Sequence, residues 1–544
     1  MIFFSTLLLS MFITIVLIPV FRGLALRLNI LDIPDARKVH MAPTPRSGGL
    51  AMALGALVPV VLWSPSDEFV RAAILGSTIL VFFGLVDDWK NLDYKIKFAG
   101  QIVAALLAVL YGGVKIVKLG ALLPEGLLIP DILTVPLTVI VIVGVTNAIN
   151  LADGLDGLAG GISLLSFVCI GYLAYRSDQT VIAVMAFAVS GGIFGFLRFN
   201  TFPATVFMGD AGSQFLGFSA IVLSLKLTQG HTPLSPLLPL ILLGFPVLDT
   251  LTVMLQRMSE GHSPFHPDNK HFHHKLIRIG LLHSEAVVAI YTIQTLLTFA
   301  AFYFRFYSEW SLLAFFILFS SIIVCGFHIT EKTGWKLKRY DFLNEIFEKR
   351  LKLLRDRILG IRITFRILRF GVPGLFFITC LIPASTPRYF SLLDLALLLL
   401  LLIVWFGAQS KLRSVLRISL YLVIPFVVFQ SEVETSTWIS AGMMHVYNLL
   451  FLLLVFVVMV TLRLSRRAGF KSTPMDFLIL FIAVVAPLLP EESIRDLHMG
   501  VVAVKIIILF FSYEVLIGEL RGELKKLGLA TMAAMVVIVL KGFI

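Results

Sequence analysis

Apolar and polar segments alternate along this chain with a long period. Apolar runs of roughly 17–22 residues recur over its whole length, and each is long enough to cross a hydrocarbon core of about 30 Å. A spanning helix satisfies its own backbone hydrogen bonds, whereas an isolated strand in lipid does not. The pattern therefore predicts an all-α, polytopic integral membrane protein.

Eleven spans are predicted in the first part of the chain, near residues 1–21, 48–63, 71–87, 98–111, 131–149, 158–175, 180–197, 211–226, 236–256, 285–304 and 310–328. Seven more are predicted beyond a basic segment, near residues 370–384, 391–407, 418–430, 442–462, 475–489, 499–517 and 527–543. The first run begins without basic residues and lacks a small-x-small cleavage site. We therefore interpret it as a retained span rather than a signal peptide.

The distribution of lysine and arginine predicts the orientation of these spans. Basic residues gather in the loops after spans 1, 3 and 9, and in the later loops at 411–413, 463–467 and 521–526. The alternate loops are poor in basic residues, and those at 431–434 and 491–492 are acidic. Because positively charged loops stay in the cytoplasm, the odd-numbered loops are predicted to be cytoplasmic and both termini outside.

Composition agrees with this fold and narrows the partners. Hydrophobic residues make up 58% of the chain and charged residues 14%, against about 25% in an average soluble domain. The net charge is +12, and between Glu331 and Arg369 twelve basic residues accompany five acidic ones. Such a juxtamembrane cluster is typical of contact with anionic lipid headgroups rather than nucleic acid. Cys169, Cys325 and Cys380 lie in apolar runs, so no disulfide framework or cysteine metal site is predicted.

Three domains are predicted: a membrane domain at 1–330, a basic cytoplasmic linker at 331–369 and a multispan extension at 370–544. Within the linker, apolar residues recur at helical spacing between Asp341 and Leu359. This stripe is typical of a helix lying on the membrane surface, and a linker helix packed on the cytoplasmic loops fits it equally well. The extension carries no recognisable motif. A scaffold for self-association or for glycan-assembly partners is the simpler interpretation of it, and a second activity in glycan handling or transport is the alternative.

Ionisable residues at the ends of spans are the candidate functional residues, because charges at membrane depth are costly. The first group is Asp87 and Asp88, followed by Asp93, at the cytoplasmic end of span 3. Adjacent carboxylates repel one another unless a cation or a proton relieves them. Mg²⁺ takes oxygen ligands and leaves coordination positions for phosphate, although a solvated helix end would also explain two aspartates.

The second group lies between spans 5 and 6, where Asn147, Asn150, Asp153 and Asp156 are interleaved with glycines. Glycine lets the backbone approach a ligand closely, and Asn and Asp make oriented hydrogen bonds to base or sugar edges. A glycine-rich turn capped by one aspartate would explain only one or two of these residues. The group therefore indicates a ligand-binding loop.

The third group, from Phe207 to Ser213, enters span 8 and contains Asp210. Asp210 can cap that helix or complete a cation site with Asp87 and Asp88.

The fourth group lies in the loop after span 9, since six of the eleven histidines fall between His262 and His283. Without a cysteine or glutamate at zinc-like spacing, these residues indicate a partly cationic surface for phosphate oxygens, to which Lys270, Lys275 and Arg278 add charge. All four groups fall on the same predicted face of the membrane, which indicates an active site.

These motifs resemble those of the polyprenyl-phosphate N-acetylhexosamine-1-phosphate transferases. This part of glycosyltransferase family 4 includes the muramyl-pentapeptide translocases and the enzymes that initiate O-antigen and teichoic acid synthesis. The matching stretches all lie within residues 1–330 and are Arg37 to Gly49, Leu85 to Asp88, Asn147 to Gly157, Val206 to Ser213 and His271 to His274.

The resemblance implies a Mg²⁺-dependent reaction, with Mn²⁺ as a substitute, in which a prenyl phosphate oxygen attacks the β-phosphorus of a UDP-sugar and UMP leaves. By this resemblance Asp87, Asp88 and Asp210 hold the metal and act in catalysis, with Asp210 the firmest ligand. His273 and His274 are likewise implied to be catalytic. Direct attack and covalent catalysis through an aspartate are both compatible with these residues.

The resemblance also implies the substrate contacts. The implied nucleotide contacts are Asn150, Asp153, Asp156 and Phe207, the last an aromatic ring able to stack on uracil. The remaining implied substrate contacts are Thr44 in the first loop, Lys97, His271 and Lys275.

The histidine motif is more similar to that of the N-acetylglucosamine-1-phosphate transferases than to the muramyl-pentapeptide type. The sequence therefore predicts transfer of GlcNAc-1-phosphate from UDP-GlcNAc to undecaprenyl phosphate, which starts a lipid-linked cell-envelope glycan such as O-antigen. The predicted location is the bacterial inner membrane, with the active site on its cytoplasmic face. Another UDP-N-acetyl-deoxyhexosamine or UDP-MurNAc-pentapeptide is the alternative donor. An inactive membrane scaffold or a transporter is the alternative of a different class, although transporters more often carry their charges at the bilayer midplane.

Overall fold

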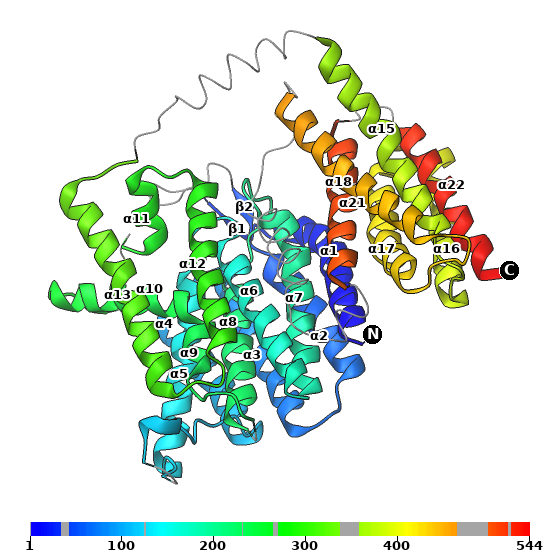
Figure 1. The fold of residues 1–544 in the computed structure, drawn as a ribbon. Coiled ribbons are helices and arrows are strands. Elements are labelled where there is room, and N and C mark those ends of the chain that lie inside the picture. Colours follow the sequence, from blue (N-terminus) through cyan, green and yellow to red (C-terminus); the bar gives the residue numbers. More distant parts are fainter. Residues whose placement is uncertain are drawn as a thin grey trace. The chain divides into compact units, whose positions relative to one another are not determined.

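The computed structural model describes residues 2–33, 43–124, 127–230, 232–264, 270–337, 358–407, 409–464, 499–519 and 524–543. Within them the chain is largely helical, and twelve helices are long and apolar enough to cross a membrane. It divides into two compact units, an N-terminal unit within residues 1–338 and a C-terminal unit beyond residue 338 (Figure 1). The predicted all-α polytopic fold is confirmed.

The N-terminal unit contains thirteen α-helices in its described residues, and its two short strands form one antiparallel pair. The elements are α1 (Ile2–Arg27), β1 (Leu31–Asp32), β2 (Thr44–Pro45), α2 (Gly48–Trp63), α3 (Glu68–Lys90), α4 (Tyr94–Leu106) with a π-helical end at Leu107–Tyr111, a 3₁₀ turn at Gly120–Leu122, α5 (Asp131–Leu151), α6 (Leu158–Arg176), α7 (Thr180–Asn200), α8 (Gly209–Gln229), α9 (Leu238–Leu242), α10 (Gly244–Ser259), α11 (Phe272–Ile279), α12 (His283–Tyr303) and α13 (Glu309–Thr333).

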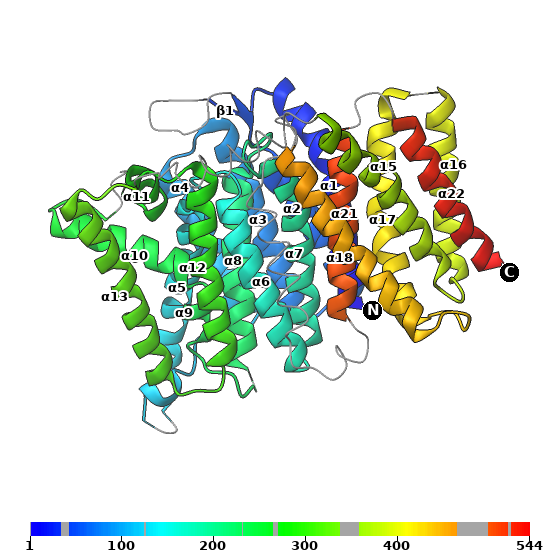
Figure 2. The same ribbon diagram turned by 45° about the horizontal axis from the view of Figure 1, so that its top comes forward.

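Helix α8 is packed among α2, α3, α5, α6 and α7 (Figure 2). In its most apolar stretch of 18 residues, 94% of the residues are buried inside the protein. The helices approach closely at small residues: a Cβ added to Gly84 would lie 2.4 Å from Ala211 Cα, and one added to Gly217 would lie 2.7 Å from Thr146 Cα. Small residues bring helix backbones together in membranes, where burial from water does not drive association. The start of α8 is therefore firmly placed among its neighbours.

Ten of the eleven predicted N-terminal spans correspond to single helices, but the ninth, predicted at 236–256, is wrong as one helix. The chain there forms α9 and α10, which meet at Leu243. Pro246 has no backbone N–H to donate to the carbonyl oxygen of Leu242. That oxygen instead accepts hydrogen bonds from Ser166 Oγ and Gln294 Nε2, each at 2.8 Å. Polar side chains of α6 and α12 thus satisfy a break that hydropathy alone did not reveal.

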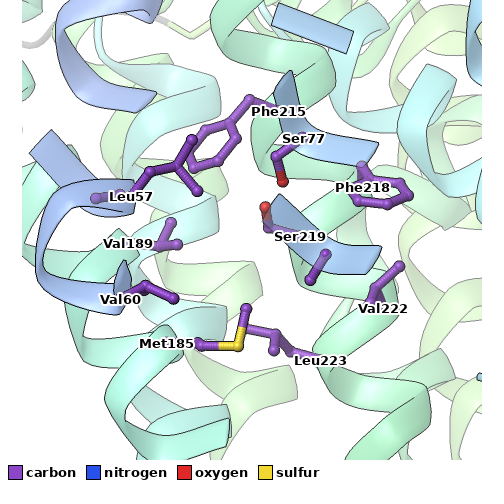
Figure 3. Close-up of a pocket in the computed structure, with 12 residues that line it drawn as sticks. Leu57, Val60, Ser77, Met185, Val189, Phe215, Phe218, Ser219, Val222 and Leu223 are labelled. Carbon is purple, nitrogen blue, oxygen red and sulfur yellow. The ribbon is translucent and has the colours of Figure 1, made fainter. Parts of the chain in front are cut away.

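A small cavity of about 20 Å³ lies between α2, α3, α7 and α8. Its wall is mainly apolar, with Met185, Phe215 and Phe218 among the lining side chains. Ser77 and Ser219 bring their hydroxyl groups toward each other across it (Figure 3). This volume is close to what one water molecule needs. The cavity is therefore too small for a substrate, and the candidate site lies elsewhere.

The C-terminal unit is also helical. Its described helices are α15 (Ile358–Leu381), α16 (Arg388–Gly407), a 3₁₀ turn at Gln409–Lys411, α17 (Leu412–Val433), α18 (Ala441–Leu464), α21 (Met499–Glu519) and α22 (Leu524–Phe543). Six of the seven predicted C-terminal spans match these helices, and the predicted span at 475–489 lies outside the described residues. Residues 341–357 of the predicted linker helix also lie outside them. Helix α15 starts at Ile358, earlier than its predicted span, because the helix continues through a basic stretch that hydropathy excludes.

The core of the C-terminal unit is apolar, with a few buried polar groups. Helices α16 and α22 are joined where Thr386 and Ser391 donate hydrogen bonds to the carbonyl oxygen of Ile538. Lys505 of α21 forms a buried ion pair with Glu432 of α17, and its Nζ lies 4.1 Å from the ring centroid of Tyr447. These contacts tie α17, α18 and α21 together inside the unit.

Candidate functional site

The ends of α3, α5 and α7, the starts of α8 and α12, helix α11 and the strand β1 meet at one end of the N-terminal unit (Figure 2). They enclose a cavity of about 300 Å³. Its lining residues are Asp32, Arg46, Asp88, Asn150, Asp153, Gly154, Leu155, Asp156, Asn200, Phe207, Gly209, Asp210, His273, His274 and His283. Residues from all four predicted groups therefore share one cavity.

Asp88, near the end of α3, caps the start of α8. Its Oδ1 accepts a hydrogen bond from the backbone N–H of Asp210 at 3.1 Å, and its Oδ2 accepts one from Ala211 at 3.3 Å. The exposed N–H groups at a helix start favour a negative charge. Gly209 makes this contact possible, because it adopts φ +67° and a Cβ there would lie 2.3 Å from Asp88 Oδ2. The adjacent-aspartate motif thus fixes the position of Asp210.

Asp87 points to different partners. Lys97 of α4 forms ion pairs with Asp87 and, at 3.0 Å, with Oδ2 of Asp210. The backbone N–H of Leu92 also donates to Asp87 Oδ1 at 2.6 Å. A single ammonium group therefore lies between two carboxylates from α3 and α8. This arrangement places a cation beside Asp210, one of the residues that line the candidate site.

The second predicted group spans the end of α5 and the loop between α5 and α6. Asn150, in the last turn of α5, accepts a hydrogen bond from Ser213 Oγ, which connects α5 to α8. Asp153 lines the cavity, and burial raises the pKa of its carboxyl to about 7, with repulsion from Asp210 and Asp156 adding to the rise. Asp153 is therefore a carboxyl that changes its charge near neutral pH.

The same loop is held in shape by α7 and α12. Asn200 Oδ1 accepts from the backbone N–H of Gly157 at 2.9 Å, and Tyr291 donates to the carbonyl oxygen of Gly157 at 2.6 Å. Asp156 accepts from the backbone N–H of Ala204 at 2.9 Å. Gly157 itself has φ +82°, a conformation that glycine adopts readily. Asp153 and Asp156, two of the predicted nucleotide contacts, therefore lie on a braced loop.

The histidine motif is divided between two roles. His271 Nδ1 lies 2.8 Å from Oδ2 of Asp249. The other oxygen of this carboxylate, Oδ1, accepts a hydrogen bond from the backbone N–H of Phe272 at 2.8 Å. His273 and His274 instead line the cavity. Burial, reinforced by the neighbouring histidines, holds the pKa of His273 well below its usual range, so this ring is neutral near pH 7. A neutral imidazole beside phosphate can donate or accept a hydrogen bond.

Arg46 and Asp32 form an ion pair on the paired strands. Nη1 of Arg46 also lies 3.8 Å from Oδ1 of Asp88. Burial alone would lower the pKa of the guanidinium, but Asp32 and then Asp88 and Asp210 hold it above its usual range. Arg46 is therefore a permanent cation at the cavity wall.

Of the thirteen predicted site residues, eight line the cavity and five do not. The eight are Asp88, Asn150, Asp153, Asp156, Phe207, Asp210, His273 and His274. Asp87 and Lys97 lie next to the lining, because Lys97 forms ion pairs with both Asp87 and Asp210. Thr44 is buried in β2, where it pairs in register with Asp32. His271 is held by Asp249, and buried Lys275 lies 3.6 Å from Glu331. These three adjoin the lining residues along the chain rather than contributing to the lining.

Four lining residues with polar side chains were not among the predicted site residues: Asp32, Arg46, Asn200 and His283. Arg46 lies inside the first-loop motif, and His283 belongs to the histidine-rich segment, so both carried a sequence signal. Asn200 carried a weaker one as a polar residue at the end of an apolar span. Asp32 had none, because its partner Arg46 is brought to it only by strand pairing.

The donor set at the cavity fits Mg²⁺ by its chemistry. Five aspartates line the cavity beside one arginine, with no lysine among the lining residues described. Mg²⁺ is usually bound through one or two carboxylates together with water and substrate phosphates, and does not require an all-protein cage. Within the described part of the chain no three His, Cys, Asp or Glu side chains are grouped to hold a metal by themselves. The ligand set Asp87, Asp88 and Asp210 stays a prediction.

The sequence of this chain is similar to those of known glycosyltransferases. Residues 70–228 match the sequence pattern of glycosyl transferase family 4. The chain is 34% identical over 353 residues to a probable undecaprenyl-phosphate N-acetylglucosaminyl 1-phosphate transferase of Bacillus subtilis (strain 168), covering 63% of this chain and 95% of that protein. It is 31% identical over 345 residues to the undecaprenyl-phosphate α-N-acetylglucosaminyl 1-phosphate transferase of Escherichia coli (strain K12), covering 62% and 93%. The Yersinia pestis protein with the same name is 30% identical over 327 residues, covering 59% and 88%.

Proposed function

We propose, since the chain belongs to glycosyl transferase family 4, that it transfers GlcNAc-1-phosphate from UDP-GlcNAc to undecaprenyl phosphate and releases UMP. The observation that carries this proposal is the single cavity of about 300 Å³ lined by residues from four separated motifs. We further propose that the protein lies in the bacterial inner membrane and that this cavity opens to the cytoplasm. UDP-sugars are made in the cytoplasm, and basic loops are retained there.

The reaction joins two anions, so its main physical obstacle is electrostatic. An oxygen of the prenyl phosphate forms a bond to the β-phosphorus, the bond from that phosphorus to the bridging oxygen breaks, and UMP leaves with the electron pair. The attacking phosphate is already ionised at neutral pH, so positioning and charge stabilisation supply most of the catalysis. Lys97, between Asp87 and Asp210, supports this proposal because its ammonium brings positive charge next to Asp210 at the cavity.

Other residues of the chain orient the reactants. His273, neutral and buried beside His274, can hydrogen-bond a phosphate oxygen without taking up a proton. Phe207 at the cavity wall offers a ring for the uracil, and Asp153 and Asn150 offer oriented hydrogen bonds to the nucleotide. Mg²⁺, which Asp210 with Asp87 or Asp88 would hold, would neutralise phosphate charge when bound.

A direct test uses purified full-length protein with undecaprenyl phosphate, Mg²⁺ and a panel of donors. We expect UMP release with UDP-GlcNAc, and loss of that release when Mg²⁺ is chelated. Asp210→Asn should lower turnover roughly 10²–10³-fold, because it removes a charge that positions both phosphate and ion. The matched control is Asp131→Asn, a carboxylate whose side chain is 90% exposed at the start of α5. Absence of UMP release with every donor, UDP-MurNAc-pentapeptide included, would refute the proposal.

A further inference from the structure

Arg46 occupies a defined place at the cavity wall. It directly follows β2, and its backbone pairs with Phe207 in a parallel bridge. The backbone N–H of Phe207 donates to the carbonyl oxygen of Pro45 at 2.8 Å, so the chain around Arg46 is attached to the loop that precedes α8. The main chain on both sides of residue 46 is therefore held against the loop that precedes α8, because the backbone N–H of Gly48 also donates to the carbonyl oxygen of Phe207 at 2.9 Å.

The guanidinium is oriented by one of its two terminal nitrogens. Nη2 of Arg46 is hydrogen-bonded to Oδ1 of Asp32. Nη1 lies 3.8 Å from Oδ1 of Asp88, which is too long for a hydrogen bond. About a quarter of the arginine side chain is exposed, and Arg46 is one of the residues that line the cavity. One edge of the planar group is thus anchored, while the other can donate to a ligand.

Arg46 lines the same cavity as Phe207, Asp88 and Asp210. Phe207, the ring proposed for uracil, is its partner in the backbone bridge. Against the opposing effect of burial, Asp32, Asp88 and Asp210 together raise the pKa of the Arg46 guanidinium. A nucleotide diphosphate in this cavity therefore shares it with the Arg46 guanidinium. Arginine matches phosphate oxygens with two parallel N–H donors, which lysine does not.

We propose that Arg46 binds the β-phosphate of the nucleotide-sugar diphosphate, and that Asp32 is the internal counter-ion that holds the guanidinium ready. This inference rests on the proposed function, because it takes a UDP-sugar as the ligand of the cavity. It adds a substrate-binding residue outside the aspartate and histidine motifs. It also explains why an aspartate follows α1, far from the reacting groups in sequence.

The test compares the affinities of UDP and UMP for the purified full chain with Mg²⁺ present, measured by titration calorimetry. UDP has the β-phosphate and UMP lacks it. We expect Arg46→Met to weaken UDP binding roughly tenfold to a hundredfold, the usual range for a lost charge-assisted hydrogen bond, and to leave UMP binding nearly unchanged. Arg46→Lys, which keeps the charge and loses the fork, should lie between the two.

Arg71→Met is the matched control, since Arg71 is exposed at the opposite end of α3 and bonded to Ser66. It should leave both affinities unchanged. Equal losses for UDP and UMP in both Arg46 variants would overturn the inference, because they would indicate a general effect on the cavity. The inference would also be overturned if Arg46→Lys and Arg46→Met both bound UDP as tightly as the wild-type protein does. If wild-type protein binds neither nucleotide and releases no UMP, the proposed function itself fails, an outcome distinct from the other two.

Discussion

Asp87 and Asp88 are neighbours in sequence but have separate tasks in the structure. Asp88 uses both oxygens to accept backbone N–H groups at the start of α8, while Asp87 is paired with Lys97. The two carboxylates therefore relieve their repulsion through different partners, one a helix terminus and the other an ammonium group. A motif that resembles a metal-binding pair serves first to place Asp210, the residue that we expect to be the firmest ligand.

Asp153 gives the folded chain a pH dependence whose sign follows from its surroundings. Burial raises its pKa to about 7, whereas the unfolded chain releases the same proton near pH 4. The unfolded state therefore loses this proton first, and stability falls as the pH rises from about 4 through about 7. We expect Asp153→Asn, without divalent cations, to melt a few degrees above wild type near pH 8 and at nearly the same temperature near pH 4.

Thermal unfolding in detergent, followed by circular dichroism, measures this difference. The exposed Asp131→Asn variant should show no comparable growth of the difference with pH, because its carboxylate is 90% exposed. A melting difference for Asp153→Asn that stays constant between these two pH values would contradict the prediction.

At the scale of elements, the start of α8 determines the geometry of the site. Gly84 brings α3 against Ala211, and Gly209 lets the chain turn beneath Asp88. The helix has neighbours on all sides, so a change at its first residue cannot be absorbed by tilting the whole helix. Backbone contacts, rather than side-chain chemistry, therefore limit which residues these positions accept.

We expect Gly209→Ala to destabilise the protein by roughly 1–2 kcal/mol or more, the cost of a left-handed conformation for a residue with a Cβ, with a further cost from the clash at Asp88. Turnover should fall further than stability alone predicts, because Asp88 must move and Asp210 moves with it. Gly230→Ala, at the other end of α8 and with its nearest contact at 3.6 Å, is the control and should be almost neutral. Normal turnover in Gly209→Ala would contradict this account of the helix start.

The buried pair Lys505–Glu432 makes a separate prediction for the C-terminal unit. Lys505 is 2% exposed and packs over the ring of Tyr447. Removing one partner leaves an uncompensated charge inside an apolar bundle, so Lys505→Met or Glu432→Gln should each cost roughly 3–5 kcal/mol. The double variant should recover much of that loss. Unfolding of the three variants measures the coupling, and additive losses in the double variant would show that the pair does not interact.

At the scale of the whole molecule, the residues of the proposed active site all belong to the N-terminal unit. The cavity, its bracing residues and the family match at 70–228 lie within residues 1–338. The C-terminal unit has its own apolar core and its own buried ion pair. Two units with separate cores are expected to fold with considerable independence.

We therefore expect a chain that ends after residue 338 to insert into the membrane and to release UMP from UDP-GlcNAc at a rate within roughly an order of magnitude of the full chain. Comparison of the two proteins in the same vesicles, at equal amounts of folded protein, gives the measurement. Complete loss of turnover in a truncated protein that still binds UDP would show that the C-terminal unit takes part in the reaction.

The hydropathy pattern predicted most helices because the requirement it reflects is local: each span must be apolar over the thickness of the bilayer. It failed at 236–256, where Ser166 and Gln294 satisfy a free carbonyl from neighbouring helices. The motifs likewise located most of the cavity lining, because residues at alternate loops must fall on one side of a membrane. They did not separate His271, held by Asp249, from His273 and His274 at the cavity.

The sequence by itself determined the class of fold, the face on which the motifs gather and the family resemblance, since each depends on runs of neighbouring residues. Only the tertiary structure decided which side chains meet. Lys97 and Asp210 are 113 residues apart, and Asp88 and the start of α8 are 122 apart. Such contacts depend on close packing between helices at glycines and on strand pairing around Arg46, and neither leaves a periodic signal in a single chain.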